Sequence, residues 1–303
     1  MFRITAKEQL STTVAKLVVE APYIARKRKA GNFVIVRVSE TGERIPLTIV
    51  DADTSEGTIT LIVQAVGKTT KLLVKKEAGD VLVDMVGPLG NATPIHYYSK
   101  VACVGGGVGT AELLPIAAAL RSAGNSIYSI IGARTKDLII LEREMREHSA
   151  GLFVTTDDGS YGRKGFVTDQ LRSLLDSLLG IEAVYAIGPL PMMKAVSALT
   201  REYGIKTYVS LNAIMVDGTG MCGGCRVTEY PHKFGVDGQM KFACVDGPEF
   251  DGHKVDFDEL IMRNRSYVDL EQIADSRSDG APVDSREDES ALRLHEGLMY
   301  ELH

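Results

Sequence analysis

The sequence predicts a β barrel, followed by an α/β domain with a doubly wound parallel sheet and a small C-terminal cysteine-rich segment. Short β-branched runs between turn residues fill the chain to about His96, and strand-like and helix-like segments alternate from Lys100. Three of the four cysteines fall between residues 222 and 244. We therefore expect domains over 1–97, 98–211 and 212–253, and a C-terminal extension over 254–303 that contacts a partner.

The whole-chain composition narrows the class of protein. The chain has 303 residues, which is enough for two or three domains, and its 45% hydrophobic and 24% charged content is ordinary for a globular protein. Its net charge of −6 argues against a nucleic-acid or anionic-membrane surface. We see no bilayer-length apolar run and no apolar signal region, so we expect a cytoplasmic protein with reduced cysteines.

The first part of the chain reads as several short strands. Turn residues at 30–32, 40–42, 55–57 and 78–79 separate them, and one helix over 68–76 interrupts them. Strands at this spacing suggest a small barrel. The expected strands cover 12–20, 33–38, 58–66 and 80–86.

The second part alternates strands and helices, which indicates an open parallel sheet with helices on both faces. The expected strands cover 100–104, 126–131, 151–156 and 183–187, with a final strand over 206–211. The expected helices cover 112–123, 138–148, 167–179 and 191–203. Beyond the cysteines we expect a helix over 256–264, a polar solvated stretch over 274–290 and a last helix over 291–302.

A glycine-rich turn follows the first strand of the α/β part and opens a helix, where a phosphate-binding turn belongs. Glycine removes the side chains that would block a pyrophosphate. Thr110 stands where the last glycine of the dinucleotide pattern would be, and a tight turn without a ligand is the alternative interpretation. The candidate residues are Gly105, Gly106, Gly107, Val108, Gly109 and Thr110.

Turns after three other strands point to the same edge of the sheet. Each could be a plain loop, but together they line the crevice where ligands bind in open α/β sheets. The candidate residues are Arg134, Asp157, Gly188, Pro189 and Met192.

The cysteine-rich segment suggests a metal centre. Cys222 and Cys225 form a C-x2-C pair, Cys244 supplies a third thiolate, and Asp217 stands five residues before the pair. The spacing D-x4-C-x2-C…C matches the plant-type [2Fe–2S] pattern with aspartate in place of the first cysteine. Zinc and a redox dithiol remain alternatives, whereas Cys103, in an apolar strand, fits the role of a core residue.

Taken in order, these features resemble the ferredoxin–NADP reductase superfamily, whose Arg-x-Pro-x-Ser/Thr stretch binds FAD. The resemblance implies that Arg44 contacts the FAD pyrophosphate, and that Pro46, Leu47 and Thr48 lie along the isoalloxazine. The Thr48 hydroxyl would then approach the reactive edge of the flavin as the catalytic group. Leu47 replaces the aromatic residue of classical reductases. A second FAD phosphate loop would comprise Gly67, Lys68, Thr69 and Thr70.

The cluster segment narrows the resemblance to two families of electron-transfer subunit. One is the dihydroorotate dehydrogenase B type, whose cluster ligands are four cysteines. The other is the small subunit of NADH-dependent reduced ferredoxin:NADP oxidoreductase, whose ligands are one aspartate and three cysteines. Asp217 with Cys222, Cys225 and Cys244 sides with the second family, and the helix expected over 256–263 also resembles it.

The second resemblance implies hydride transfer between NAD(H) and FAD, followed by one-electron transfer to a [2Fe–2S] cluster. A larger flavin and iron–sulfur subunit would handle NADP(H) and ferredoxin. Arg134 and Lys136 stand where an NAD site usually carries an acid, and their charges could favour a 2′-phosphate. The alternatives are a dihydroorotate dehydrogenase B subunit and a nucleotide-binding regulator with structural zinc.

Overall fold

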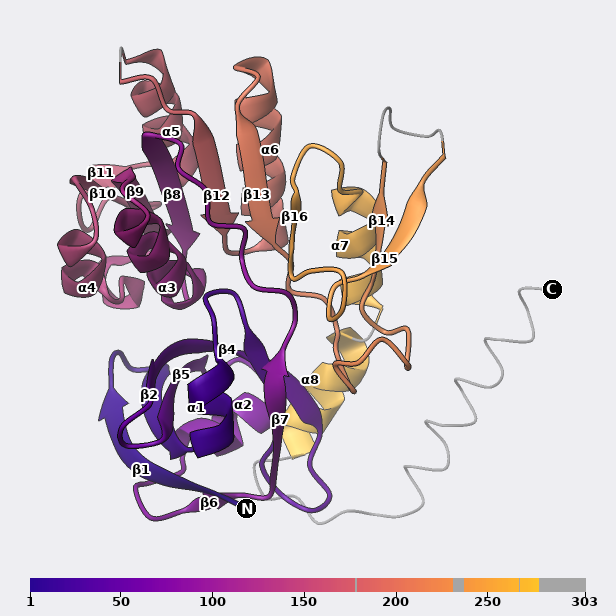
Figure 1. The fold of residues 1–303 in the computed structure, drawn as a ribbon. Helices are drawn as coiled ribbons and strands as arrows, with labels where there is room; N and C mark the ends of the chain where they lie inside the picture. The colour runs from indigo at the N-terminus through magenta and orange to yellow at the C-terminus, as the bar shows by residue number, and fades with distance from the viewer. Residues whose placement is uncertain (178, 231–236, 267, 278–303) are drawn as a thin grey trace. The chain divides into compact units, whose positions relative to one another are not determined.

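The computed structural model describes residues 1–177, 179–230, 237–266 and 268–277 (Figure 1). Residues 1–265 form one compact unit, and the described residues beyond 265 belong to a second. In the second unit, helix α8 (Val268–Arg277) includes residues 274–277, the start of the expected solvated stretch over 274–290, whose exposure stays a prediction. The rest of that stretch and the expected helix over 291–302 lie outside the described residues. The domain boundaries at 97, 211 and 253 stay predictions.

The predicted barrel is confirmed as a nearly closed antiparallel sheet in the order β6-β1-β2-β5-β4-β3-β7. Its end strands β6 and β7 are separated only by Val83, so the two edges of the sheet meet there without pairing. The strands are β1 (Phe2–Gln9), β2 (Val14–Glu20), β3 (Phe33–Arg37), β4 (Arg44–Asp53), β5 (Thr58–Gln64), β6 (Val81–Leu82) and β7 (Asp84–Leu89).

Sequence reasoning missed strand β1 and helix α1 of the barrel, and it expected a strand at Thr48 without giving its bounds. Strand β1 was missed because Ile4 is its single buried residue and its other side chains are mostly polar. Strand β4 carries the stretch that begins at Arg44, and helix α1 (Pro22–Lys27) is one and a half turns long. Helix α2 (Lys68–Val74) occupies the place that was predicted for it.

The predicted parallel sheet is also confirmed, in the order β11-β10-β9-β8-β12-β13-β16. Helices α3 and α4 cover one face, and α5 and α6 cover the other (Figure 1). The strands are β8 (Lys100–Gly106), β9 (Ser126–Ala133), β10 (Gly151–Thr156), β11 (Arg163–Lys164), β12 (Ala183–Ile187), β13 (Lys206–Ser210) and β16 (Glu249–Asp251). The helices are α3 (Gly109–Ser122), α4 (Glu142–Glu147), α5 (Val167–Asp176) and α6 (Leu190–Glu202).

Three details of this domain correct the sequence expectations. Strand β13 is not the last strand of the sheet, because β16 pairs with it antiparallel. A 3₁₀ turn (Lys136–Leu138) precedes α4, so the helix expected over 138–148 is shorter. Helix α3 begins at Gly109, which places Pro115 in its second turn, where proline leaves the Ala111 carbonyl without its helical N–H partner.

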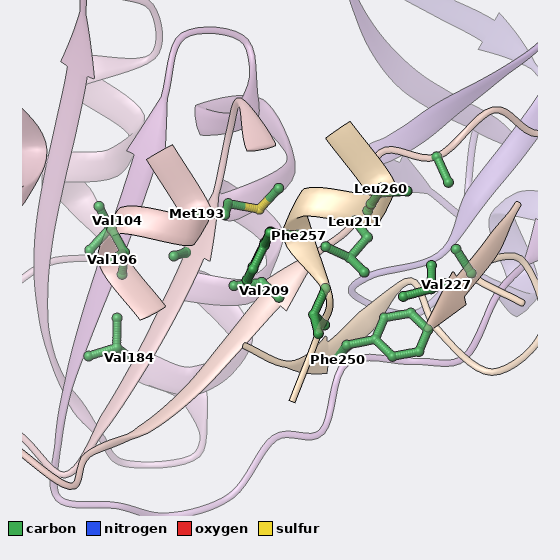
Figure 2. Close-up of a cluster of buried hydrophobic side chains, with 14 of the residues drawn as sticks. Val104, Val184, Met193, Val196, Val209, Leu211, Val227, Phe250, Phe257 and Leu260 are labelled. Atoms are coloured by element: carbon green, nitrogen blue, oxygen red, sulfur yellow. The ribbon is translucent and has the colours of Figure 1, made fainter. Parts of the chain in front are cut away.

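The cysteine-rich segment is built onto the α/β sheet by a shared apolar core. Figure 2 shows Val209 of β13 and Leu211, just after that strand, near Phe257 and Leu260 of α7 (Phe257–Arg265). Hairpin β14 (Arg226–Glu229) and β15 (Gln239–Phe242) contributes Val227 to the same core. Burial of these side chains holds the cysteine-rich segment against the α/β domain. Each helix in the described part of the chain is too short or too polar to cross a bilayer.

Candidate cofactor sites

A cavity of about 1080 Å³ lies between the barrel and the carboxyl edge of the parallel sheet. Strand β8, whose end opens into it, lies between β9 and β12, where the strand order reverses. From the barrel side the cavity is lined by Pro46, Leu47, Thr48 and Thr70. From the sheet side the predicted residues that line it are Gly106, Gly107, Val108, Gly109, Arg134, Asp157, Gly188, Pro189 and Met192.

The glycine-rich turn after β8 packs tightly against the turn after β12. A Cβ on Gly109 would lie 2.6 Å from the Ile187 carbonyl oxygen, and one on Gly106 would lie 2.4 Å from Met192 Sδ. The Gly107 N–H donates to the Gly132 carbonyl at 2.8 Å, so it holds the turn instead of facing a ligand. The absence of side chains therefore leaves space at the edge of the sheet for a dinucleotide.

Gly105 and Thr110 lie behind this turn, outside the cavity lining. Thr110 is buried, and a Cβ on Gly105 would be 2.9 Å from Thr110 Oγ1. Their contribution is to pack helix α3 on strand β8.

The barrel side of the cavity is formed by β4. Ile45 and Leu47 pack against the barrel core, whereas Thr48 bonds the Glu112 side chain. The Ser210 hydroxyl also donates to the Glu112 carboxylate. Burial raises the pKa of Glu112, which is therefore held as the neutral acid over a wider pH range. Sequence reasoning missed Glu112 because a glutamate in an amphipathic helix usually faces solvent.

Arg44 lies away from the cavity lining. Its Nη1 pairs with Asp84 at 2.9 Å, and its Nε donates to the Val216 carbonyl at 3.0 Å. Its assignment to a pyrophosphate stays a prediction.

The predicted second phosphate loop opens helix α2. The Thr70 hydroxyl accepts the Gly67 N–H at 3.0 Å, which caps the helix, and Thr70 reaches the cavity. Thr69 instead donates to Glu43 at 2.7 Å, and Lys68 is exposed. Only the Thr70 end of this loop therefore faces the cavity.

The four candidate cluster ligands lie in two pairs. The sulfurs of Cys225 and Cys244 are 3.2 Å apart and buried, while Asp217 accepts the Cys222 N–H at 2.7 Å and its carboxylate also meets the Cys222 thiol. The Asp217 charge also acts on Cys244, so the two pairs are neighbours. Among the described residues, no three such side chains converge on a single metal position.

Glycines shape the loop that carries these ligands. Gly218, Gly220 and Gly223 have φ of 73°, 84° and 67°, which other residues seldom adopt. Asp217 also accepts the Thr219 N–H at 2.9 Å, and this bond lowers the pKa of its carboxyl. The loop therefore turns around a carboxylate that stays ionised at neutral pH.

The donor set fits a two-iron centre better than a single zinc ion. Two ligands for each iron match the two observed pairs, and backbone N–H groups approach sulfur, as in Cys244 N–H to Cys225 Sγ at 3.5 Å. Burial and the Cys225 thiol raise the pKa of Cys244 to about 12. At neutral pH that thiolate therefore requires a bound metal.

The class of protein follows from the order of its parts, which are a barrel, an α/β domain and a cysteine-rich segment. Together they define a flavin-dependent reductase with its own iron–sulfur centre. Comparison with family models supports this class. Residues 1–93 match the oxidoreductase FAD-binding domain, and residues 212–256 match the iron–sulfur cluster binding domain of dihydroorotate dehydrogenase B. FAD and a [2Fe–2S] cluster are thus the cofactors of this chain, as predicted.

The relatives identify the family. The chain is 48% identical over 274 residues to the dihydroorotate dehydrogenase B (NAD⁺) electron transfer subunit homolog of Thermotoga maritima, covering 90% of this chain and 94% of the relative. It is 32% identical to the corresponding electron transfer subunit of Geobacillus thermodenitrificans, covering 82% and 94%. The chain belongs to the family of dihydroorotate dehydrogenase B electron transfer subunits and their homologues.

A solved structure of an NADH-dependent reduced ferredoxin-NADP oxidoreductase contains a similar chain. It is 46% identical, with a TM-score of 0.85, and the match covers 91% of this chain and 97% of that one. The resemblance to both families is thereby confirmed.

Proposed function

We propose that this subunit moves electrons between NAD(H), FAD and the [2Fe–2S] cluster and exchanges them with a larger flavin and iron–sulfur subunit. That partner would handle NADP(H) and ferredoxin, as in an electron-bifurcating transhydrogenase. The main observation in favour of this proposal is Asp217. It stands at the first ligand position, and its carboxylate accepts the Cys222 N–H. The 46% identical chain of the ferredoxin-NADP oxidoreductase structure supports it.

The placement of the residues suggests how the chain serves this reaction. When bound, FAD accepts a hydride and releases its electrons one at a time. We infer that Pro46, Leu47 and Thr48 hold the flavin ring, and that the glycine turn from Gly106 to Gly109 holds the nicotinamide nucleotide. Both line the same cavity, so the nucleotide would meet the flavin inside it.

The cluster loop comes close to the flavin-binding strand. Arg44 of β4 bonds the carbonyl of Val216, the residue before Asp217. This bond supports a short path for electrons from the cavity to the cluster. The residues proposed as ligands are Asp217, Cys222, Cys225 and Cys244.

The electron transfer subunit of a dihydroorotate dehydrogenase is the second candidate, and the names of several relatives favour it. By the resemblance, that type carries a fourth cysteine where this chain has Asp217. A regulator with structural zinc has lost support, because residues 212–256 match an iron–sulfur domain.

Anaerobic purification of the native complex tests the proposal. We expect a heterodimer that contains FAD, extra iron–sulfur clusters on the partner and NADH-dependent reduction of NADP⁺ with reduced ferredoxin. A partner that oxidises dihydroorotate would establish the second candidate instead. Kinetics with NADH and NADPH on the wild type and an Arg134→Gln variant would show which nucleotide the exposed Arg134 serves.

A further inference from the structure

Five oxygen-bearing side chains lie in series between the cofactor cavity and a second hollow on the molecule. The first is Thr48 of the barrel, at the cavity. The others are Glu112 on α3, Ser210 on β13, Glu249 on β16 and Thr93 in the segment that links barrel and sheet. None of them belongs to the cluster ligands or to the glycine turns.

Glu112 forms the cavity end of this series. It lines the cavity and bonds two hydroxyls, those of Thr48 and Ser210. Because Thr48 belongs to the barrel and Ser210 to the sheet, the carboxyl spans the boundary between the two domains.

The pairing of strands β13 and β16 places Ser210 next to Glu249. The two residues are directly opposite in the antiparallel pair β13–β16, so their side chains share one face of the sheet. Cβ atoms of such pairs lie about 4.5–5.5 Å apart. The neighbouring pair Val209 and Phe250 points to the other face, into the apolar core.

Glu249 forms the outer end. It accepts the Thr93 hydroxyl at 2.7 Å and lines a hollow of about 240 Å³. The backbone of Gly31, with φ of 85°, closes over this contact. A Cβ there would lie 2.2 Å from Thr93 Oγ1 and 2.8 Å from Glu249 Oε1. The titratable side chains sharing the hollow are Tyr208, Glu229, Lys241, Asp246 and Asp251.

The proposed function leaves one proton inside the cavity for each NADH oxidised. A hydride carries two electrons and a proton, and with FAD and the cluster bound the electrons would leave singly to a one-electron acceptor. The balance is NADH plus two oxidised acceptors giving NAD⁺, H⁺ and two reduced acceptors. Resting on that function, we propose that Glu112 and Glu249, through Thr48 and Ser210, carry this proton from the cavity to the second hollow.

The protonation of the two carboxyls suits this task. Burial raises the pKa of Glu112, and burial together with the nearby Glu112 raises the pKa of Glu249 to about 8. A proton carrier works best when its pKa is near the operating pH.

The test uses the cofactor-loaded protein in stopped-flow experiments. NADH first reduces the flavin, and ferricyanide, a one-electron acceptor, then reoxidises it in H₂O and in D₂O. We expect Glu112→Gln and Glu249→Gln to slow reoxidation about tenfold or more, with a larger solvent isotope effect. In Glu249→Gln, whose side chain lies outside the cofactor cavity, reduction by NADH stays within about twofold of the wild type, since hydride transfer needs no proton from this path. Glu229→Gln, at the same hollow but outside the series, is the matched control.

Wild-type reoxidation rates and isotope effects in both variants would overturn the proton path. A wild-type protein whose flavin NADH cannot reduce would overturn the proposed function itself, so the two failures are distinct. Infrared spectra of the resting protein give a readout independent of turnover. We expect protonated-carboxyl absorption at pH 7 that is weaker in Glu249→Gln than in the wild type and unchanged in Glu229→Gln, and its absence from the wild type contradicts the proposal.

Discussion

The Arg44 guanidinium donates to the Val216 carbonyl oxygen at 3.0 Å and so joins barrel strand β4 to the loop of the cluster. The same guanidinium pairs with Asp84 at 2.9 Å. Both groups of this ion pair are about one third exposed, which limits its contribution to stability to roughly 1 kcal/mol or less. The contribution of Arg44 is geometric, because its bond to the Val216 carbonyl holds the residue next to Asp217 in place.

We predict that Arg44→Gln alters the environment of the cluster while the protein keeps its FAD. The substitution removes the charge and loosens the cluster loop, which should change the electron paramagnetic resonance spectrum of the reduced cluster. Arg44→Lys, which can keep the ion pair with Asp84 but not the guanidinium bond to Val216, separates the loss of the charge from the loss of that bond. If Arg44→Gln purifies without FAD, Arg44 reaches the pyrophosphate as the family resemblance implies.

Asp217 gives a second prediction, because it has two separable roles. As a ligand it needs its charge, whereas as a loop former it needs only oxygen acceptors for the N–H groups of Thr219 and Cys222. We expect Asp217→Asn, which keeps one acceptor oxygen and loses one of these two backbone bonds, to fold with a loosened loop and lose most of the iron. We expect Asp217→Cys to keep a cluster with an altered absorption spectrum. Iron and sulfide analysis after anaerobic purification measures both. Full iron content in Asp217→Asn would remove Asp217 from the ligand set.

Local sequence signals were sufficient for the fold and for the glycine and cysteine motifs. The turn from Gly105 to Gly109 and the C-x2-C pair are contiguous, and β-branched or helical periodicity marks most elements. Strand β1 escaped because its side chains are nearly all polar or exposed, so the only signal was one buried Ile4.

Contacts that depend on tertiary register could not be predicted. Ser210 and Glu249 are brought together by the pairing of β13 with β16, and nothing near either residue indicates that pairing. Glu112 has the sequence context of a surface helix, but it is half-buried and its carboxyl contacts Thr48 of the barrel and Ser210 of the sheet. The direction of the Arg44 side chain likewise depends on its contacts with Asp84 and the Val216 carbonyl, which lie in distant parts of the sequence.

The glycine turn allows a third prediction with a built-in comparison. A Cβ on Gly109 meets backbone, the Ile187 carbonyl at 2.6 Å, whereas one on Gly106 meets the flexible end of Met192 at 2.4 Å. We expect Gly109→Ala to cost roughly 1–3 kcal/mol of unfolding free energy and Gly106→Ala less, since the Met192 side chain can move. Thermal unfolding measures the order.

The same two variants should differ in nucleotide binding. Gly106→Ala pushes Met192 toward the cavity that both residues line, so we expect it to weaken NADH binding without a matching loss of stability. Equal effects of both variants on stability and NADH titration would show that the turn adapts freely.

The Glu249 carboxyl predicts a pH dependence of stability. Burial raises its pKa from 4.5 to about 8, so between these values the folded protein holds a proton that the unfolded chain has released. Stability from this group is therefore fully present below about pH 4.5, falls as the pH rises, and is lost above about pH 8, with a total of the order of a few kcal/mol at most. Glu249→Gln imitates the neutral acid and removes the loss. We expect its thermal midpoint to exceed that of the wild type by a margin that grows from pH 5 to pH 8, while Glu229→Gln runs parallel to the wild type. Parallel curves for Glu249→Gln would show that the carboxyl titrates normally and holds no proton at neutral pH.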